Sequence, residues 1–248
     1  MKKVAGILFF LFVVATVAAQ GVCVKNETVS DSEGNVYETV QIGRQCWMKE
    51  NMRTLRAADG QPLTLADFDS VSYDIPYAYY PGNDESNVSH DGLLYNWAAA
   101  RTVCPSGWHL PSSSDFFALT TYLKEEMHLI DEIYLYKDDL ERFPGYENFT
   151  MGKALADTAG WTDSCYDKEG TVGSNQQANN MMGFSARPAG TKSWNDRGSG
   201  AYFWLSDYYV TPKHPRYMQL QACRLGVYTD DFLSATEGMS VRCIRETK

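Results

Sequence analysis

The chain has 248 residues, and its 31 acidic residues outnumber its 22 Lys and Arg, giving a formal net charge of -9. Nucleic acids and anionic membranes bind basic patches, so an acidic chain is a poor match for either. We therefore expect neither as a partner. Aromatic residues make up 13% of the chain, with 16 Tyr and 6 Trp, and such side chains suit both a core and an exposed binding surface.

The first nineteen residues have the pattern of a cleavable export signal. Lys2 and Lys3 form a positive start, an apolar run follows over 4–17, and small residues end the segment before Gln20. A membrane span needs about 20 apolar residues, and this run is shorter. We expect cleavage before Gln20, no stable membrane insertion afterwards, and a protein that is secreted, periplasmic or on the cell surface.

All six cysteines lie after the predicted signal. An even number of cysteines in an exported chain favours disulfides over free thiols or metal ligands. There is no Cys-x-x-Cys pair, and the four histidines are not spaced as metal ligands. We therefore predict no metal site and no cofactor, while calcium is an alternative without a supporting motif. The residues alone do not choose among the disulfide pairings that six cysteines permit.

The N-terminal part predicts a β-hairpin followed by loops. Residues 36–42 alternate as a strand does, and 43–44 turn the chain into a second strand at 45–48. Residues 56–92 are rich in Gly, Pro, Asp, Asn and Tyr and predict long irregular loops. A short helix is expected over 93–101.

The clearest helix follows Pro111. Ser112 is a suitable N-cap, and Asp115 completes a capping-box pattern three residues later. Apolar residues then recur at helical spacing, at Phe116, Leu119, Leu123 and Met127. The sequence therefore predicts an amphipathic helix that begins at this cap.

The remaining segments predict a small amount of helix and then mostly strands. Residues 128–150 have the character of an insertion, 152–158 predict a short helix, and 164–181 are irregular. Strand-like segments follow at 183–187, 201–206, 217–223, 226–229 and 239–245. Since there is no repeat and no break in composition, we predict one α+β domain whose C-terminal half is mostly antiparallel sheet.

Nine short stretches together resemble one family. They are Asp31–Tyr37, Val40–Met48 with Glu50-Asn51, Gly92–Trp97, Cys104–Pro111, Gly152–Leu155, Gly160-Trp161, Gly183–Ala186, Ala201–Trp204 and Ser240–Cys243. In this order and spacing, the chain resembles the Fibrobacter succinogenes major paralogous domain family, which occurs in exported proteins of Fibrobacter and Bacteroidetes-type bacteria. The chain departs from the family pattern in the 128–150 insertion, and at Arg187 and Leu205, where the family more often has an apolar residue and a serine.

The resemblance implies a disulfide-stapled C-type-lectin-like fold, close to that of the formylglycine-generating (sulfatase-modifying) enzymes. It divides the chain into a signal peptide at 1–19, an N-terminal segment at 20–30 and the family domain at 31–246. Large apolar anchors for such a loop-rich fold are Trp47, Trp97, Trp108, Trp161 and Trp204.

The same resemblance implies a set of disulfides. The two chain ends of a lectin-like fold meet in one sheet, which would bring Cys104, before the main helix, to Cys243 on the last strand. Cys23–Cys46 would join the N-terminal segment to the first hairpin, and Cys165–Cys223 is the remaining pair.

Two polar segments resemble calcium ligands without completing a known site. Trp194-Asn195-Asp196 matches a calcium-ligand motif of sugar-binding C-type lectins, in which Asn and Asp oxygens suit a hard cation. It lies too far before the last cysteine and has no EPN or QPD partner, so a polar turn is favoured. Residues 31–35 lack the glycine and glutamate positions of a calcium loop, which favours a turn at the entry to the hairpin.

No catalytic residues are assigned. An enzyme related to the formylglycine generators would need free thiols, for which Cys223 and Cys243 are the candidates, but six cysteines can all pair. A Gly-x-Ser-x-Gly motif is absent, and His109 is interpreted as a structural hydrogen-bonding residue. A carboxylate pair for glycoside hydrolysis stays open, because its geometry is not visible in a sequence.

The favoured function is a non-catalytic exported binding module of the bacterial cell envelope or surface, with a glycan or a protein as its ligand. The alternatives are the enzyme above and a structural component of a surface assembly. The expected binding surface combines the 73–92 loop with the 164–200 stretch. Its candidate residues are Tyr73, Tyr77, Tyr79, Tyr80, Trp194, Asn195 and Asp196.

Overall fold

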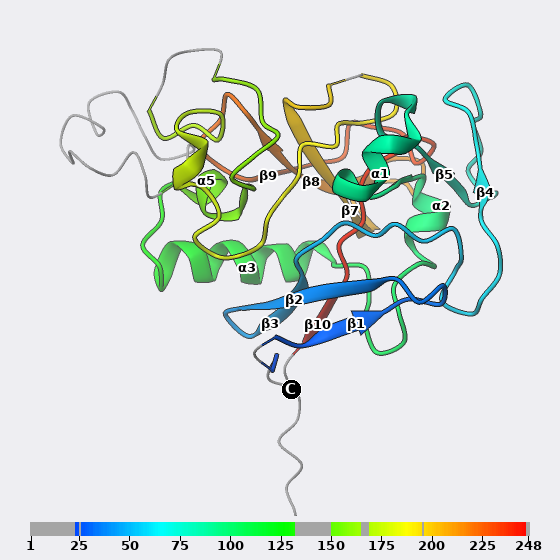
Figure 1. Cartoon of the computed structure of the whole chain (residues 1–248), viewed down its shortest axis with the longest axis horizontal. Helices are drawn as coiled ribbons and strands as arrows, with labels where there is room; N and C mark the ends of the chain where they lie inside the picture. Colours follow the sequence, from blue (N-terminus) through cyan, green and yellow to red (C-terminus); the bar gives the residue numbers. More distant parts are fainter. Residues whose placement is uncertain (1–22, 25, 132–149, 165–168, 195, 247–248) are drawn as a thin grey trace, which may run out of the picture.

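The computed structural model describes residues 23–24, 26–131, 150–164, 169–194 and 196–246 (Figure 1). The predicted signal peptide, most of the 128–150 insertion, Cys165 and Asn195 lie outside the described residues. Within the described part of the chain, no helix has the length and apolar character needed to cross a membrane.

Within the described residues, ten short strands form three sheets. They are β1 (Thr28–Ser30), β2 (Val36–Ile42), β3 (Gln45–Met48), β4 (Thr64–Leu65), β5 (Tyr77–Tyr79), β6 (Leu94–Tyr95), β7 (Gly200–Tyr208), β8 (Pro215–Gln221), β9 (Tyr228–Asp230) and β10 (Ile244–Glu246). The sheets have the strand orders β1-β2-β3-β10, β4-β5-β6 and β7-β8-β9. All of the pairings are antiparallel except that of β4 with β5.

The described helices are short apart from α3. They are α1 (Val88–Asp91), α2 (Trp97–Ala100), α3 (Ser113–Glu125) and α5 (Met151–Leu155), with 3-10 turns η1 (Pro81–Asn83), η2 (Glu85–Asn87) and η5 (Gln176–Ala178). The predicted mixture of few helices and antiparallel sheets is therefore confirmed at the level of an α+β domain.

The predicted N-terminal hairpin is confirmed. Strands β2 and β3 pair antiparallel, with Val40 opposite Trp47 and Ile42 opposite Gln45. Gly43 sits in the turn between them with a φ of +60°, a conformation that glycine adopts without steric cost.

The C-terminal strand β10 joins the N-terminal strands in the first sheet, because it pairs antiparallel with β3 (Figure 1). The Cys104–Cys243 disulfide, with 5.6 Å between its Cα atoms, ties the segment before α3 to the chain just before β10. This pairing confirms the prediction from the family resemblance.

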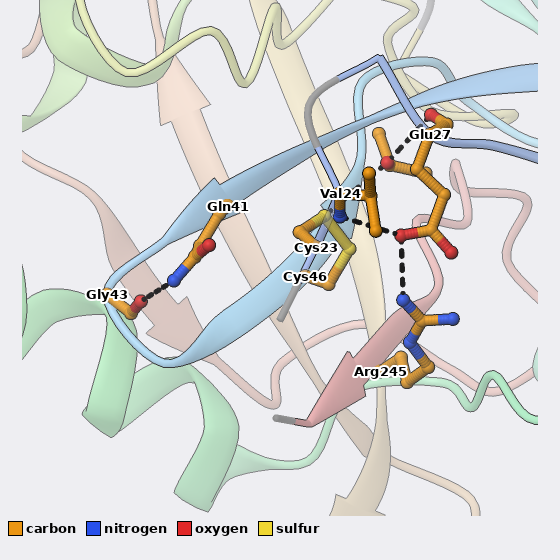
Figure 2. The surroundings of a disulfide bond; sticks show 8 residues. Cys23, Val24, Glu27, Gln41, Gly43, Cys46 and Arg245 are labelled. Carbon is orange, nitrogen blue, oxygen red and sulfur yellow. Dashed lines mark hydrogen bonds and ion pairs between the residues drawn. A yellow bond between two sulfur atoms is a disulfide. The ribbon is translucent and has the colours of Figure 1, made fainter. Parts of the chain in front are cut away.

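The Cys23–Cys46 disulfide is also confirmed and joins the N-terminal segment to β3 (Figure 2). Glu27 strengthens the same attachment, since its carboxylate accepts a hydrogen bond from Arg245 on β10 (2.8 Å). The third predicted pair, Cys165–Cys223, includes a cysteine outside the described residues.

Helix α3 begins at the predicted cap. The N–H of Asp115 donates to the Ser112 hydroxyl (3.3 Å), and the N–H of Ser112 donates to the Asp115 carboxylate (2.7 Å), which completes the capping box. Leu119 and Leu123 are fully buried against the hairpin and the third sheet, so the predicted apolar face is the one that packs.

The sheet β7-β8-β9 separates two apolar clusters. On one face, Phe203 and Met218 pack with α3 and the hairpin. On the other face, Trp204 and Tyr217 pack with the helix α2 region. The five tryptophans predicted as anchors are all buried: Trp47, Trp97, Trp108, Trp161 and Trp204.

Several predicted elements need correction. The 56–92 loops also contain β4, β5 and α1, and 93–101 divides into β6 and α2. These two- and three-residue strands form by pairing between distant segments, so they leave no periodicity in the sequence.

The strand expected at 183–187 is a single bridge between Ala186 and Ala156. Gly183 and Ser185 have positive φ values, 71° and 55°, which are incompatible with an extended strand. In the last segment, only Ile244–Glu246 forms a strand, and Met239 and Ser240 make single bridges.

Candidate functional site

Residues 232–238 run between loops that are far apart in the sequence. The Ser234 hydroxyl donates to the hydroxyl of Tyr73 (3.4 Å). One residue later, the N–H of Ala235 donates to the carbonyl of Lys213 in the turn between β7 and β8 (2.7 Å). The segment therefore holds the 70s loop and the β7–β8 turn beside each other.

Lys192 attaches a third loop to the same segment. Its N–H donates to the carbonyl of Gly238 (3.0 Å), and its ammonium donates to the carbonyls of Thr236 (3.1 Å) and Ser70 (3.3 Å). The ammonium also lies 5.0 Å from the centroid of the Tyr79 ring. Burial lowers the pKa of Lys192, although the nearby carboxylates of Glu237 and Asp69 raise it. The two regions expected to form the binding surface thus do meet.

Exposed aromatic side chains stand on this group of segments, and we call Tyr73, Trp194, Tyr209 and Phe232 the aromatic surface. Tyr209 and Phe232 are each 73% exposed, Tyr73 is 47% exposed and Trp194 is 46% exposed. Exposed aliphatic residues accompany them, at Val71, Ile75 and Val210. Aromatic residues displayed on loops over a rigid sheet are typical of binding surfaces.

Charged groups lie next to two of these rings. The Arg216 guanidinium is 5.2 Å from the centroid of the Tyr209 ring, and both residues line a hollow of about 280 Å³ together with Asp230. The Asp230 carboxylate accepts hydrogen bonds from the N–H groups of Asp231 (2.8 Å) and Phe232 (3.2 Å). This turn holds the chain as it leaves β9, where the Phe232 ring is exposed.

Three of the four tyrosines predicted for the 73–92 loop are less exposed than expected, which corrects their placement. Tyr79 is fully buried, and its hydroxyl donates to the carbonyl of Ser70 (3.2 Å). Tyr77 and Tyr80 are half-buried, and the N–H of Tyr77 donates to the side chain of Asn96 (3.0 Å). Their rings support the loops, whereas Tyr73 is displayed.

Asn195 lies outside the described residues, and Thr191 contacts the residues on either side of it. Oδ1 of Asp196 accepts the N–H of Thr191 (2.9 Å), and the N–H of Trp194 donates to the Thr191 hydroxyl (3.1 Å). The Trp194 ring packs edge-on against Tyr202, with 5.9 Å between ring centroids. The predicted polar turn at 194–196 stays a prediction because it includes Asn195, whereas Trp194 is exposed.

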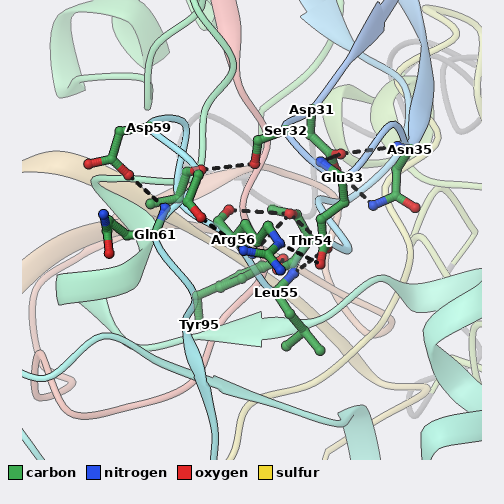
Figure 3. Close-up of polar contacts among 12 residues, drawn as sticks. Asp31, Ser32, Glu33, Asn35, Thr54, Leu55, Arg56, Asp59, Gln61 and Tyr95 are labelled. Atoms are coloured by element: carbon green, nitrogen blue, oxygen red, sulfur yellow. Dashed lines mark hydrogen bonds and ion pairs between the residues drawn. The ribbon is translucent and has the colours of Figure 1, made fainter.

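The turn at 31–35 uses its acidic groups for hydrogen bonds within the protein (Figure 3). The Asp31 carboxylate accepts the N–H groups of Glu33 (2.9 Å) and Asn35 (3.0 Å) and the hydroxyl of Tyr37 (2.6 Å). The Glu33 carboxylate accepts the hydroxyl of Thr54 (3.0 Å). The predicted hairpin-entry turn is confirmed.

One group of residues of metal-binding type occurs within the described part of the chain, and it consists of Cys23, Glu27 and Cys46. The two sulfur atoms form a disulfide, and Glu27 binds Arg245 (Figure 2). Because a thiolate is the metal-binding form of cysteine, this group does not fit a metal ion.

The cysteine chemistry proposed for an enzyme also conflicts with the disulfides. Cys243 is bonded to Cys104, and Cys223 is also in a disulfide. Among the described residues, none of the cysteines is free. Neither candidate thiol is therefore available as a nucleophile while its disulfide is intact.

Sequence reasoning missed Lys192, Tyr209 and Phe232. Two signals were present: Tyr208-Tyr209-Val210 precedes the Thr-Pro turn, and Phe232 follows two aspartates. Large apolar residues usually fill a core, so their occurrence at turns indicates exposed side chains with another role. The role of Lys192 had no local signal, since its partners are more than 40 positions away.

The antiparallel sheets, short helices and two described disulfides define a disulfide-stapled α+β domain. The family model described as the Fibrobacter succinogenes major domain matches residues 40–245. The chain therefore belongs to the Fibrobacter succinogenes major domain family. A search of curated proteins and a search of solved structures found no match.

Proposed function

We propose that this chain is an exported, non-catalytic binding module with a C-type-lectin-like fold, which binds a glycan at the bacterial cell envelope or surface through its aromatic surface. The observation that carries the proposal is the exposure of Tyr73, Trp194, Tyr209 and Phe232 on loops that all attach to residues 232–238. Exposed rings of this kind offer apolar faces at low conformational cost.

The chemistry beside the rings favours a glycan over a purely apolar ligand. A sugar ring has apolar C–H faces and a rim of hydroxyl groups, and each hydroxyl both donates and accepts hydrogen bonds. Arg216 supplies donors and Asp230 supplies an acceptor next to Tyr209. The aromatic surface therefore offers both kinds of contact that a sugar needs.

The lectin-like fold is supported by two features. Strand β10 joins the N-terminal strands in one sheet, and Cys104–Cys243 links the chain just before β10 to the segment before α3. These features agree with what the family resemblance implies, and disulfides are typical of exported proteins.

Glycan-array binding of the exported chain tests the proposal, followed by titration with the strongest ligand, with and without a chelator. We expect Tyr209→Ala and Phe232→Ala each to weaken binding about tenfold or more, because exposed aromatic anchors dominate such interfaces. The chelator arm separates recognition by the rings from recognition through a bound cation, and we expect it to have no effect.

Phe117→Ala is the matched control, since Phe117 is equally exposed at 71% but lies on α3. We expect this variant to bind as the unaltered chain does. If no glycan on the array binds, or if Phe117→Ala loses as much affinity as Tyr209→Ala and Phe232→Ala, the aromatic surface does not bind glycans.

A further inference from the structure

A polar pocket of about 310 Å³ lies at the open end of the β2–β3 hairpin, apart from the aromatic surface. Five stretches of the chain line it: Glu38, 49–53, 88–92, Asp157 and 185–187. None of the four rings of the aromatic surface lines it. The volume lies at the lower end of the range for small-molecule sites.

The floor of the pocket is held rigid by a buried hydrogen-bond network. The Asn51 side-chain amide donates to the carbonyl of Asp91 (2.8 Å) and to the hydroxyl of Ser240 (3.1 Å). Its oxygen accepts Nε of Arg242 (2.7 Å). Arg242 is fully buried and also donates to the carbonyl of Ser185 (2.7 Å). A floor with this many satisfied contacts is preorganised for a ligand.

Ser185 lines the pocket in a strained conformation. Its φ is +55°, in the left-handed region that non-glycine residues rarely occupy. The side chain of Asn180 stabilises it, donating to the Ser185 hydroxyl (2.8 Å) and accepting its N–H (2.8 Å). Strain of this kind persists where the surroundings impose it and is concentrated at functional sites.

The walls carry opposite charges in pairs. The Lys49 ammonium lies 2.5 Å from the Glu38 carboxylate. Arg187 lies 3.5 Å from Asp157. A further pair, Arg53 and Glu50, is separated by 3.7 Å. Three cations and three carboxylates therefore line one small space with no net charge.

This balance selects the class of ligand. An ionic ligand would be attracted by one sign of charge and repelled by an equal number of the other, so it gains no net attraction from this lining. A hydroxyl group interacts favourably with both signs, because it accepts from a guanidinium and donates to a carboxylate at the same time. Several adjacent hydroxyls on one ring would match several adjacent charge pairs.

We propose that this pocket binds one neutral, polyhydroxylated ring, the chemistry of an uncharged monosaccharide, either free or at the end of a glycan chain. The pocket is a second site that does not depend on the aromatic surface. Carboxylates and guanidinium groups on its walls hold the hydroxyls, and the floor built on Asn51 and Arg242 fixes their positions.

Titration of the ¹⁵N-labelled exported chain by NMR tests this proposal. The probes are D-glucose, D-galactose, N-acetyl-D-glucosamine and myo-inositol, each up to about 10 mM, tenfold above a weak millimolar Kd. D-glucuronate and D-glucosamine are the charged counterparts. We expect saturable shifts around Asn51 and Ser185 with at least one neutral probe, and binding of its charged counterpart at least about fivefold weaker.

The variant Glu50→Gln removes one carboxylate acceptor at a half-exposed position, so the fold should be retained. We expect it to weaken binding of the neutral probe about tenfold. Glu246→Gln, at an exposed position on β10 outside the pocket, is the matched control and should bind normally. Tyr209→Ala should leave this binding unchanged, which separates the pocket from the aromatic surface.

Three outcomes would overturn the proposal: no neutral probe saturates, a charged counterpart binds more tightly, or Glu50→Gln binds as well as the unaltered chain. A short oligosaccharide ending in the ring that binds then distinguishes the source. Binding of that oligosaccharide supports a glycan end, and binding of the free sugar alone supports a solute.

Discussion

Asp115 interacts with the start of α3 and with His109 at the same time. Its carboxylate accepts hydrogen bonds from the N–H and the hydroxyl of Ser112 (2.7 Å each) and lies 3.7 Å from Nε2 of His109. Burial raises the pKa of Asp115, but the nearby His109 imidazole and the hydrogen bonds from Ser112 outweigh burial and lower the pKa to about 2. The Asp115 carboxylate in turn raises the pKa of His109.

We expect Asp115→Asn to lower the free energy of unfolding by about 1 kcal/mol near pH 6, the usual value of a helix cap. The folded-state pKa of Asp115 is depressed, so its stabilising effect is present above about pH 4 and is lost as the pH falls towards 2. The His109 contribution has the opposite sign: it is present below the ordinary histidine pKa and is lost as the pH rises through the raised one.

Urea unfolding of the unaltered chain and of Asp115→Asn at several pH values checks this prediction. The difference between their free energies of unfolding should be largest between about pH 4 and 6.5 and should disappear near pH 2. Asp59→Asn is the control, because Asp59 lies in an exposed turn where it accepts the N–H of Gln61. A difference for Asp115→Asn that stays constant down to pH 2 would contradict the assignment.

The connections between elements depend on close backbone approach. Gly92 joins α1 to β6 with a φ of +71°, and a Cβ there would lie 2.6 Å from Cβ of Asn51 and 2.7 Å from the carbonyl oxygen of Met52. Gly60 also has a positive φ, +87°, but a Cβ there would meet open space. Substitution of Gly60 therefore measures the cost of a positive φ alone, whereas substitution of Gly92 adds the cost of a steric clash with neighbouring atoms.

We expect Gly60→Ala to cost about 1 kcal/mol from conformational strain alone. Gly92→Ala should cost more than about 3 kcal/mol, because overpacking against backbone adds to the same strain. Denaturant midpoints of the two variants measure the difference. Equal losses of unfolding free energy in the two variants would show that Asn51 and Met52 can move away from a Cβ at position 92.

The elements differ in how far local sequence predicts them. The β2–β3 hairpin and α3 follow from alternation, a turn glycine and a capping box, all within a few neighbouring residues. Strands β4 and β6 have two residues each and exist only through pairing with β5. No local period is possible over two residues, so only the assembled sheet reveals them.

For the whole molecule, the two described disulfides close chain loops of very different length. Cys104–Cys243 spans 139 positions, whereas Cys23–Cys46 spans 23. A disulfide stabilises partly by restricting the unfolded chain, and this restriction grows with the length of the closed loop.

Replacing Cys104 and Cys243 together with alanine should therefore lower the free energy of unfolding by about 5 kcal/mol, against about 3.5 kcal/mol for the Cys23 and Cys46 pair. Guanidinium unfolding of the two double variants measures which pair contributes more to the free energy of unfolding. The reverse order would mean that local contacts around Cys23, such as Glu27 with Arg245, outweigh loop entropy.

The candidate site was only partly predictable at this scale. Aromatic content and the loop character of residues 73–92 and 164–200 indicated which regions to examine, and Tyr73 and Trp194 are exposed as expected. Tyr79 is buried instead, because Lys192 and Ser70 close over it. Exposure depends on neighbours that approach from distant parts of the chain.

Charge, cysteine count, the export-signal pattern, the hairpin and the capped helix all follow from residues that are adjacent or a few positions apart, and they can be deduced from the chain itself. The aromatic surface and the polar pocket arise differently. Asn51 and Arg242 are separated by 191 positions, and Lys192 and Ser70 by 122. Pairings over such distances leave no local pattern, because they form only when the sheets and disulfides bring the segments together.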